Sequence, residues 1–227
     1  MGRETYVLSK WDYGKSWEKF PIEYNQIWGA GYNKVLCSSL NSSTSQKFIE
    51  SVTPVDLVYT DPPWNTSLLK GFRTKAGLDS DRHQINPFLQ HLVVLAKRLK
   101  AKTYYLEIGK QKLNYLKEVI EKTGATITDI WDATYYKKNL MYIIRYQYDN
   151  ITPSPVDLTG MDDEDTPRIV IENEKPQTVF DFCTGRGLTG KSSYDVAKFY
   201  GIELNKRRLA NLLEWYHKKG TAVWKMK

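Results

Sequence analysis

The tetrapeptide Asp61-Pro62-Pro63-Trp64 combines residue types that can hold a planar substrate by one polar edge. It follows residues 55–60, a largely apolar run typical of a buried strand. The strand must end there, because two prolines have no N–H to donate to a sheet. Its end presents a carboxylate, free backbone carbonyls in a rigid turn and a large aromatic ring. Ligands bind at the carboxyl ends of strands in open α/β sheets, so this turn is a candidate substrate site.

A glycine-rich loop follows a second buried-type strand, residues 178–183. Residues 185–190 have the Gly-x-Gly-x-x-Gly spacing of dinucleotide-binding loops. Residues 185–192 also match the Gly-x-x-x-x-Gly-Lys-Ser pattern of the phosphate-binding loop in nucleotide hydrolases. Both patterns require a strand, a loop and a helix in that order. The local context therefore does not choose between them.

Two acidic residues favour a nucleoside cofactor over a nucleoside triphosphate. Glu203 ends the next predicted strand, 18 positions after Gly185, where an acid can accept hydrogen bonds from ribose hydroxyls. Asp181 precedes the glycines, where a carboxylate would repel a triphosphate and favour a cationic ligand. In addition, no apolar run that ends in Asp follows the loop as a magnesium-holding strand. ATP binding that is lost with Lys191→Ala would support the hydrolase alternative.

The remaining pattern alternates strands and helices, as in an α/β domain. Residues 65–86 contain few apolar positions and are predicted to form a basic loop. Residues 149–176 are rich in acidic residues and prolines and are predicted to form an acidic, mobile loop. The other predicted elements are strands at residues 34–37, 55–59, 103–108, 178–183, 201–205 and 221–226, helices at 44–49, 87–100, 112–123, 191–200 and 206–219, and a hairpin of 125–136 and 140–148.

A chain of 227 residues with 41% hydrophobic residues suits one compact domain, which we place at residues 34–227. An aromatic-rich arm, residues 1–33, precedes it. The arm either buries its rings against the domain or uses some of them as a lid or a nucleic-acid platform. The chain has two cysteines, which are too few for a disulfide framework or a metal cluster. It also shows no apolar core of a signal peptide and no stretch of membrane-spanning length. These features favour a cytoplasmic protein.

The net charge of +7 favours an anionic partner, of which nucleic acid is the first candidate; a basic protein without such a partner is the alternative. Lone His83 is expected to be a surface residue rather than a catalyst or a metal ligand. The candidate nucleic-acid contacts are Lys70, Arg73, Lys75 and Arg82 in the basic loop, and Lys137 and Lys138 at the hairpin turn.

The tetrapeptide, residues 180–187 and Glu203 together resemble the amino-group methyltransferases that use S-adenosylmethionine. These are similar to adenine-N6 and cytosine-N4 DNA methyltransferases. The tetrapeptide precedes the glycine loop, an order that resembles the circularly permuted β-type subgroup. The resemblance covers roughly residues 34–148 and 178–220. It implies a Rossmann-like α/β fold: a mostly parallel, seven-stranded sheet with one antiparallel hairpin strand.

The resemblance also implies a role for each site residue. The Asp61 carboxylate and the Pro62 carbonyl would take both hydrogens of an exocyclic amine, which localises its lone pair towards the incoming methyl group. Pro63 would fix the turn, and Trp64 would stack on a base that has left the duplex. No metal is expected. The implied S-adenosylmethionine site comprises Asp181, Phe182, Cys183, Thr184, Gly185, Gly187, Glu203, Leu204 and Asn205.

The sequence departs from the family pattern in three places. Phe182 and Cys183 stand where the family often has proline and a small residue, and Arg186 stands where a small residue is common. A helix leading into the cofactor strand is not evident within residues 149–176. No large target-recognition domain is visible either. The basic loop and the hairpin would then recognise the DNA sequence, or a partner subunit would do so, or the enzyme would have little sequence specificity.

The function predicted from this resemblance is adenine-N6 methylation of DNA, because Asp rather than Ser before the two prolines favours adenine in this family. The alternatives are the same chemistry on RNA adenine or on cytosine N4 of DNA. From another class, the chain could be a catalytically silent, nucleic-acid-binding subunit of a complex. A homodimer or a partner subunit is compatible with each of these.

Overall fold

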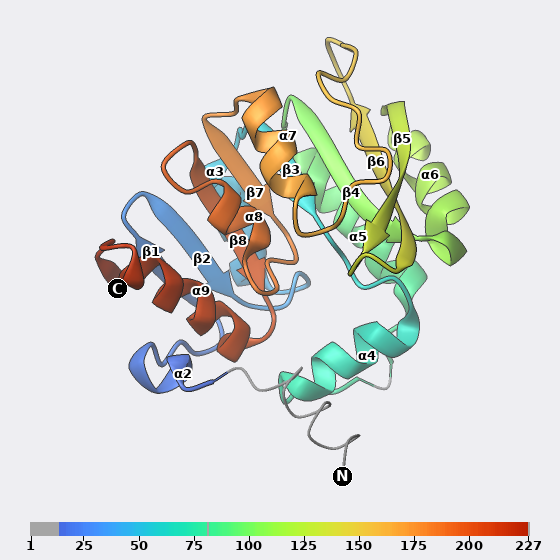
Figure 1. Cartoon of the computed structure of the whole chain (residues 1–227). Coiled ribbons are helices and arrows are strands. Elements are labelled where there is room, and N and C mark those ends of the chain that lie inside the picture. Colours follow the sequence, from blue (N-terminus) through green and yellow to red (C-terminus); the bar gives the residue numbers. More distant parts are fainter. Residues whose placement is uncertain (1–13, 81, 227) are drawn as a thin grey trace.

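The computed structural model describes residues 14–80 and 82–226, and within these ranges nine strands form one sheet (Figure 1). The strand order is β5-β6-β4-β3-β7-β8-β2-β1-β9. The strands are β1 (Gln26–Ala30), β2 (Asn33–Cys37), β3 (Leu57–Thr60), β4 (Thr103–Gly109), β5 (Thr126–Tyr135), β6 (Asn139–Gln147), β7 (Thr178–Asp181), β8 (Lys198–Glu203) and β9 (Val223–Lys225).

The expected α/β sheet is confirmed, but it has nine strands in the described chain rather than seven. Strands β2, β8, β7, β3 and β4 are parallel neighbours, and β6 pairs antiparallel with β4 and β5. The additional strands are β1 and β9, which pair antiparallel beyond β2. The strands predicted at residues 34–37 and 221–226 both belong to the sheet, as β2 and β9. The order of connections reverses between β3 and β7, where an open sheet forms its ligand crevice.

Helices cover both faces of this sheet (Figure 1). One core contains residues of α3, α5 and α6. The other core contains residues of α7 and α9. The helices are α2 (Ser16–Lys19), α3 (Ser43–Val52), α4 (Thr66–Lys75), α5 (Ile85–Arg98), α6 (Leu113–Lys122), which follows a 3-10 turn (Lys110–Lys112), α7 (Thr166–Glu174), α8 (Leu188–Ser192) and α9 (Lys206–Lys218).

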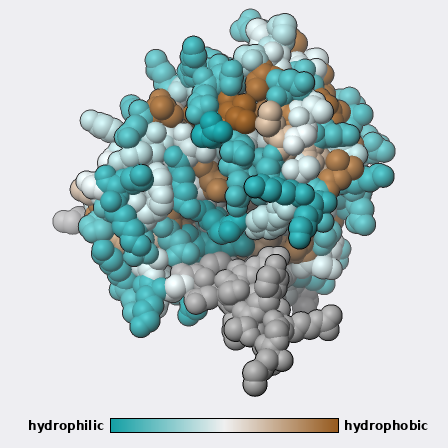
Figure 2. All heavy atoms as spheres, in the orientation of Figure 1, coloured by the Kyte–Doolittle hydropathy of each residue, from teal (hydrophilic) through white to brown (hydrophobic). Residues whose placement is uncertain are grey.

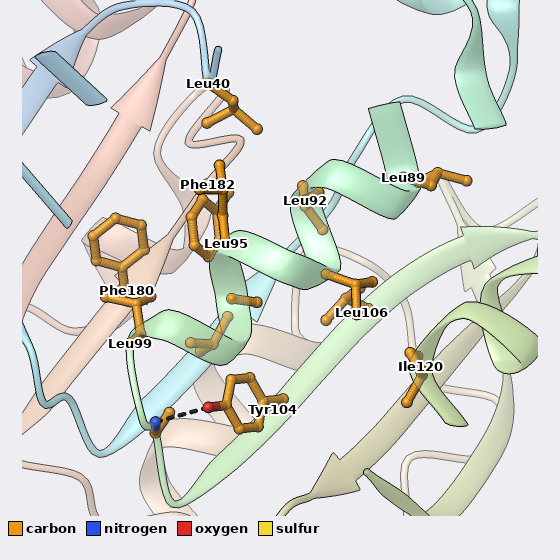
Figure 3. Close-up of a cluster of buried hydrophobic side chains, with 14 of the residues drawn as sticks. Leu40, Leu89, Leu92, Leu95, Leu99, Tyr104, Leu106, Ile120, Phe180 and Phe182 are labelled. Carbon is orange, nitrogen blue, oxygen red and sulfur yellow. Dashed lines mark hydrogen bonds between the residues drawn. The ribbon is translucent and has the colours of Figure 1, made fainter. Parts of the chain in front are cut away.

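Helix α5 shows how the apolar spacing of the sequence becomes a core. Its leucines recur every three or four residues, so they lie on one face and point towards the strands (Figure 3). Leu92 is fully buried, as are Phe180 and Leu106 of the strands beneath it. Burial of one such side chain stabilises the fold by about 1.5–3 kcal/mol. This packing holds β3, β4 and β7, whose ends carry the candidate site.

Three segments differ from their predicted structure. The basic loop contains α4, which Asn65 caps by accepting a hydrogen bond from the Leu68 N–H at 2.9 Å. The acidic loop contains α7, which has a proline in its first turn and leads directly into β7. The helix expected at residues 191–200 is wrong: α8 ends at Ser192 and β8 already begins at Lys198.

The acidic segment is also tied to the hairpin. The Asp163 N–H donates to the Thr134 carbonyl at 2.8 Å, and the Thr134 N–H donates to the Met161 carbonyl at 2.7 Å. The Asp163 and Asp162 carboxylates accept hydrogen bonds from the Tyr136 and Lys137 N–H groups, respectively, at the hairpin turn. The segment therefore fixes the turn that borders the candidate site.

Part of the predicted arm belongs to the fold. Residues 26–30 form β1, whereas the predicted aromatic contacts of residues 1–13 lie outside the described residues. Phe20 and Trp28 are buried in the core that also contains α9. The Trp17 indole N–H donates to the Ile22 carbonyl at 3.0 Å. These rings pack against the domain, as the first interpretation of the arm predicted.

One face of the protein is seen to be largely polar (Figure 2). On the face shown in Figure 2, hydrophilic residues cover most of the surface and hydrophobic residues form separate patches. Among residues 14–80 and 82–226, no helix is long and apolar enough to cross a bilayer.

Candidate active site

Neighbouring strand ends bring acidic side chains to one edge of the sheet. Asp181 ends β7, Glu203 ends β8, and Asp61 directly follows β3. The β3–β4 register pairs Thr60 with Leu106, so Glu107 of β4 lies beside Asp61 at the next position. Because these strands are parallel, their carboxyl ends meet where the connections reverse.

The acidic strand ends line one cavity of about 440 Å³, a volume within the usual range of small-molecule sites. The cavity unites the two candidate sites of the sequence. Of the predicted residues, its wall contains Asp61, Pro62, Pro63 and Trp64 from the tetrapeptide, Asp181, Phe182, Cys183, Thr184 and Gly185 from the glycine loop, and Glu203 and Leu204. Gly187 and Asn205 lie outside the wall and shape the loops behind it.

Trp64 fixes the orientation of the Asp61 carboxylate. Its indole N–H donates to Asp61 Oδ1 at 2.9 Å. The ring itself lies against Gly109, where a Cβ atom would come within 2.8 Å of it. Tyr135 approaches the ring edge-on, with 4.9 Å between ring centroids. None of the described residues donates a hydrogen bond to Asp61 Oδ2, so this oxygen can accept one from a substrate.

Backbone N–H groups fix the two carboxylates on the other side of the cavity. Glu203 accepts from the Gly185 N–H at 2.6 Å and from the Asn205 N–H at 2.7 Å, one on each oxygen. Asp181 accepts from the Cys183 N–H at 2.9 Å. The glycine loop is therefore folded around both strand ends, and both side chains are nearly buried.

Two features of position 187 require a glycine: the backbone conformation and the closeness of a neighbouring side chain. Its φ of +81° is in the left-handed region, and a Cβ atom would lie 2.6 Å from Leu212 of α9. Gly77 has a similar φ of +75° but nothing within 4 Å of a Cβ atom. Alanine substitutions at the two positions can therefore distinguish the effect of backbone strain, common to both, from the effect of steric overlap, present only at position 187.

We expect Gly187→Ala to destabilise the protein more than Gly77→Ala. Each substitution has a strain cost of about 1 kcal/mol from the positive φ, and overpacking against Leu212 adds about 1–3 kcal/mol at position 187. Urea unfolding followed by tryptophan fluorescence measures both free energies of unfolding. An equal decrease in the free energy of unfolding for the two variants would show that Leu212 does not restrict the loop.

Burial and mutual repulsion make the carboxylates of the cavity difficult to ionise. Burial, together with the nearby Asp181 and Asp163 carboxylates, raises the pKa of Asp61 to about 7, although the Trp64 hydrogen bond lowers it. Burial likewise raises the pKa of Asp181 to about 7. A cationic ligand would relieve this repulsion, whereas an anionic one would increase it.

Arg186 connects the glycine loop to the hairpin. Its guanidinium donates to the Tyr136 hydroxyl at 2.8 Å and lies over the Tyr136 ring. Tyr136 is held in turn by the Asp163 carboxylate through its backbone N–H. The arginine that departs from the family pattern thus closes one side of the cavity, which both Arg186 and Tyr136 line.

The predicted nucleic-acid contacts lie around the cavity but mostly outside its wall. Arg73 of α4 lines it. Lys70 and Lys75 lie on the same helix, and Arg82 is exposed beyond the end of α4. The exposed residues 137–138 follow Tyr136, a residue of the cavity wall, at the hairpin turn. Their contact with nucleic acid stays a prediction.

Several residues of the cavity wall were missed by the sequence analysis. Glu107 could have been identified, because it stands near the end of a predicted strand, as Asp61 does. Arg208 of α9 could not have been identified in this way, because it lies within a helix and only the fold brings it to the cavity. Its guanidinium lies over the Phe72 ring of α4, 4.8 Å from the ring centroid. The remaining missed wall residues include Ser38, Ser39, Leu40, Asn41, Tyr59, Tyr135, Asp163 and Asn211.

Comparisons with known proteins support the same fold family. M1.HpyAVI superimposes with a TM-score of 0.55 at 14% identity, over 76% of this chain and 93% of that one. A Thermus thermophilus protein named as a DNA modification methylase, in complex with S-adenosyl-L-methionine, gives 0.55 at 14% identity, over 77% and 91% of the two chains. PvuII DNA methyltransferase (cytosine-N4-specific) gives 0.52 at 11% identity, over 82% and 92%.

The chain has the fold of these DNA methyltransferases. The resemblance carried by the tetrapeptide and the glycine loop is therefore confirmed at the level of the fold. No family model matches the sequence, and no curated protein matches it.

Proposed function

We propose that this protein is an S-adenosylmethionine-dependent methyltransferase that methylates the exocyclic N6 amine of adenine in DNA. One observation carries the proposal. Asp61-Pro62-Pro63-Trp64 and the glycine loop with Asp181 and Glu203, which are far apart in sequence, line the same cavity at the reversal point of the sheet. A catalytic site and a cofactor site must adjoin in this way if a group is to pass directly between them.

The residues present fit S-adenosylmethionine. The backbone holds Glu203 at the end of β8, with its carboxylate in the cavity wall, where it can accept hydrogen bonds from ribose hydroxyls. The desolvated Asp181 carboxylate beside the glycine loop favours a ligand with positive charge. When bound, this cofactor supplies a methyl group on a positively charged sulfur. Similar folds have been solved with it, M1.HpyAVI and the Thermus thermophilus protein among them.

The protein's contribution to the reaction would be positioning and electrostatics. Asp61 Oδ2 and the Pro62 carbonyl would accept the two amine hydrogens, while Trp64 keeps the carboxylate in place. The amine lone pair is then directed away from the ring of the base and towards the methyl group. As the new nitrogen–carbon bond forms, the sulfur–carbon bond breaks, and one amine proton leaves towards Asp61 and solvent.

DNA is the proposed substrate because the cavity is flanked by the basic residues of α4 and of the hairpin turn. The base must leave the duplex to reach Asp61. Adenine is favoured by Asp before the two prolines, but the PvuII protein of similar fold is cytosine-N4-specific. RNA is the alternative substrate. We accordingly place the protein in the cytoplasm, where it would associate with nucleic acid.

The proposal predicts a pH dependence of methyl transfer to which the buried Asp163 contributes. At subsaturating cofactor, transfer should become faster as the pH rises through about 7, because Asp61 accepts the amine hydrogens only when ionised, and burial raises its pKa to about 7. Asp163→Asn removes a negative charge that raises this pKa, so the midpoint should move to lower pH. The asparagine oxygen can still accept the hydrogen bond from the Tyr136 N–H.

Asp162→Asn is the matched control for this pH dependence. Asp162 lies on the same segment and accepts a hydrogen bond from the Lys137 N–H, but it is not among the main influences on the pKa of Asp61. We expect its pH–rate midpoint to equal that of the wild type. An unchanged midpoint in Asp163→Asn, or the same shift in both variants, would contradict the assignment of this ionisation to Asp61.

Transfer of tritium from methyl-labelled S-adenosylmethionine tests the proposed function. Purified protein is incubated with duplex DNA, single-stranded DNA or RNA, and label in the nucleic acid is counted. We expect label in DNA. Label in RNA alone would support the RNA alternative, and binding to DNA without label on any substrate would support the silent subunit instead.

A further inference from the structure

Glu107 is an acidic residue of the cavity for which the proposed reaction has no use so far. It lies near the end of β4, beside Asp61 in the register, and it lines the cavity although its side chain is only 2% exposed. Full burial of a carboxyl group is costly unless the group is partnered or neutral. A buried carboxyl group in the cavity wall is therefore expected to have a partner or a role in the chemistry of the site.

One oxygen of Glu107 is fixed from behind. The Tyr59 hydroxyl hydrogen-bonds to Glu107 Oε1 and also lies 2.7 Å from the Thr166 hydroxyl. Tyr59 is completely buried and stacks on Tyr105, so this support is rigid. None of the described residues contacts Glu107 Oε2 through a hydrogen bond, which leaves this oxygen for a group in the cavity.

Glu107 and Asp61 differ in the form that their surroundings favour. Burial, with the Asp61, Asp163 and Asp181 carboxylates nearby, raises the pKa of Glu107 well above its usual value. Asp61 has the Trp64 N–H as a compensating donor, which lowers its pKa. Two interacting acids in different environments divide into a hydrogen-bond acceptor and a hydrogen-bond donor. In this pair, Asp61 would be the acceptor and Glu107 the donor.

This pair matches the edge of an amino-bearing base. Beside its amine, adenine has the ring nitrogen N1, and cytosine has N3; both accept a hydrogen bond. Asp61 is placed to accept from the amine, and Glu107 lies one strand away. Bases that carry a carbonyl group at the same edge, such as thymine or uracil, have the opposite pattern and would leave both acids mispaired.

We propose that Glu107 is a substrate-contacting residue that donates a hydrogen bond to the ring nitrogen beside the reacting amine. The inference rests on the proposed function and adds to it how the site selects an amino-bearing base. Tyr59 and Thr166 would position Glu107 for this contact.

Base analogues that lack one ring nitrogen test this contact in a double-mutant cycle. Oligonucleotide duplexes carry adenine, 1-deazaadenine or 7-deazaadenine, and methyl transfer is measured for the wild type, Glu107→Leu and Glu107→Gln. We expect the wild type to be about 10- to 100-fold slower on 1-deazaadenine, the effect of one buried hydrogen bond. Glu107→Leu should lose the same factor on adenine and on 7-deazaadenine, with no further loss on 1-deazaadenine. With 3-deazacytosine, the same design applies to cytosine.

Glu107→Gln distinguishes a hydrogen-bond donor from a purely structural residue, because it should restore the transfer rate that Glu107→Leu loses on adenine. Its amide N–H can still donate, so it should retain most of the wild-type rate on adenine. The wild-type rate should also fall at alkaline pH as Glu107 loses its proton, whereas the rate of Glu107→Gln should not.

Two results would overturn the inference in distinguishable ways. If Glu107→Leu slows transfer to adenine and to 1-deazaadenine by equal factors while S-adenosylmethionine binding is kept, Glu107 does not contact the ring nitrogen. If the wild type transfers a methyl group to none of these substrates, the proposed function itself fails, and the inference fails with it.

Discussion

Asp61→Ala should abolish methyl transfer, by at least about 1,000-fold, and leave S-adenosylmethionine binding in place. Loss of one preorganised electrostatic contact in an active site typically slows catalysis about 100- to 1,000-fold. Here the same residue would also orient the amine, so we expect the upper end or more. The cofactor contacts proposed for Glu203 and the glycine loop do not depend on Asp61, because backbone N–H groups hold them.

Calorimetric titration with S-adenosylmethionine and a transfer assay measure the two parts of this prediction. Trp64→Phe is the graded control, because it keeps a ring but removes the N–H that holds Asp61 Oδ1 at 2.9 Å. We expect its rate to lie between those of the wild type and Asp61→Ala. Loss of cofactor binding in Asp61→Ala would mean that Asp61 belongs to the cofactor site, not to the substrate site.

Arg145→Met should destabilise the protein by about 3–5 kcal/mol, the usual effect of removing one partner from a buried ion pair. The Arg145 side chain is 1% exposed and lies 3.2 Å from Glu174 at the end of α7 and 3.6 Å from Asp129 of β5. Its guanidinium also donates to the Thr152 carbonyl at 2.7 Å. Its Nε–H also donates to the Tyr105 hydroxyl at 3.1 Å. Without Arg145, the two carboxylates would lose their cation and the Tyr105 hydroxyl would lose a donor.

Arg168→Met is the matched control. Arg168 also has two acidic partners, Asp165 and Glu172, but its side chain is 50% exposed. Exposed ion pairs contribute little, so we expect its free energy of unfolding to stay close to that of the wild type. Urea unfolding of both variants measures the difference. Similar losses for the two would contradict the buried network around Arg145.

The local sequence was sufficient to predict which acidic residues would stand at strand ends around the cavity. Asp61, Asp181 and Glu203 were predicted because each ends a short apolar run. Prolines follow Asp61, the glycine loop follows Asp181, and Glu203 ends the next strand, 18 positions after Gly185. Both signals are local: apolar runs fix strands, and proline and glycine end them. The parallel sheet then places these ends together, as it does in the structure.

The sequence could not show contacts that depend on tertiary packing. Arg186 looked like a defect in the cofactor loop, and only the fold brings it to Tyr136. Asp162 and Asp163 looked like part of a solvated acidic run, yet they accept backbone hydrogen bonds of the hairpin turn. Strand β9 extends the sheet through pairing with β1, a contact between the two ends of the described chain.

Digestion of the methylated nucleic acid to nucleosides, followed by mass spectrometry, tests the central claim most directly. Wild-type protein, S-adenosylmethionine and duplex DNA should yield N6-methyldeoxyadenosine, and the Asp61→Ala reaction should yield none. N4-methyldeoxycytidine in its place would contradict the assignment to adenine. The absence of any methylated nucleoside from DNA and from RNA, with S-adenosylmethionine bound, would contradict the methyltransferase function itself.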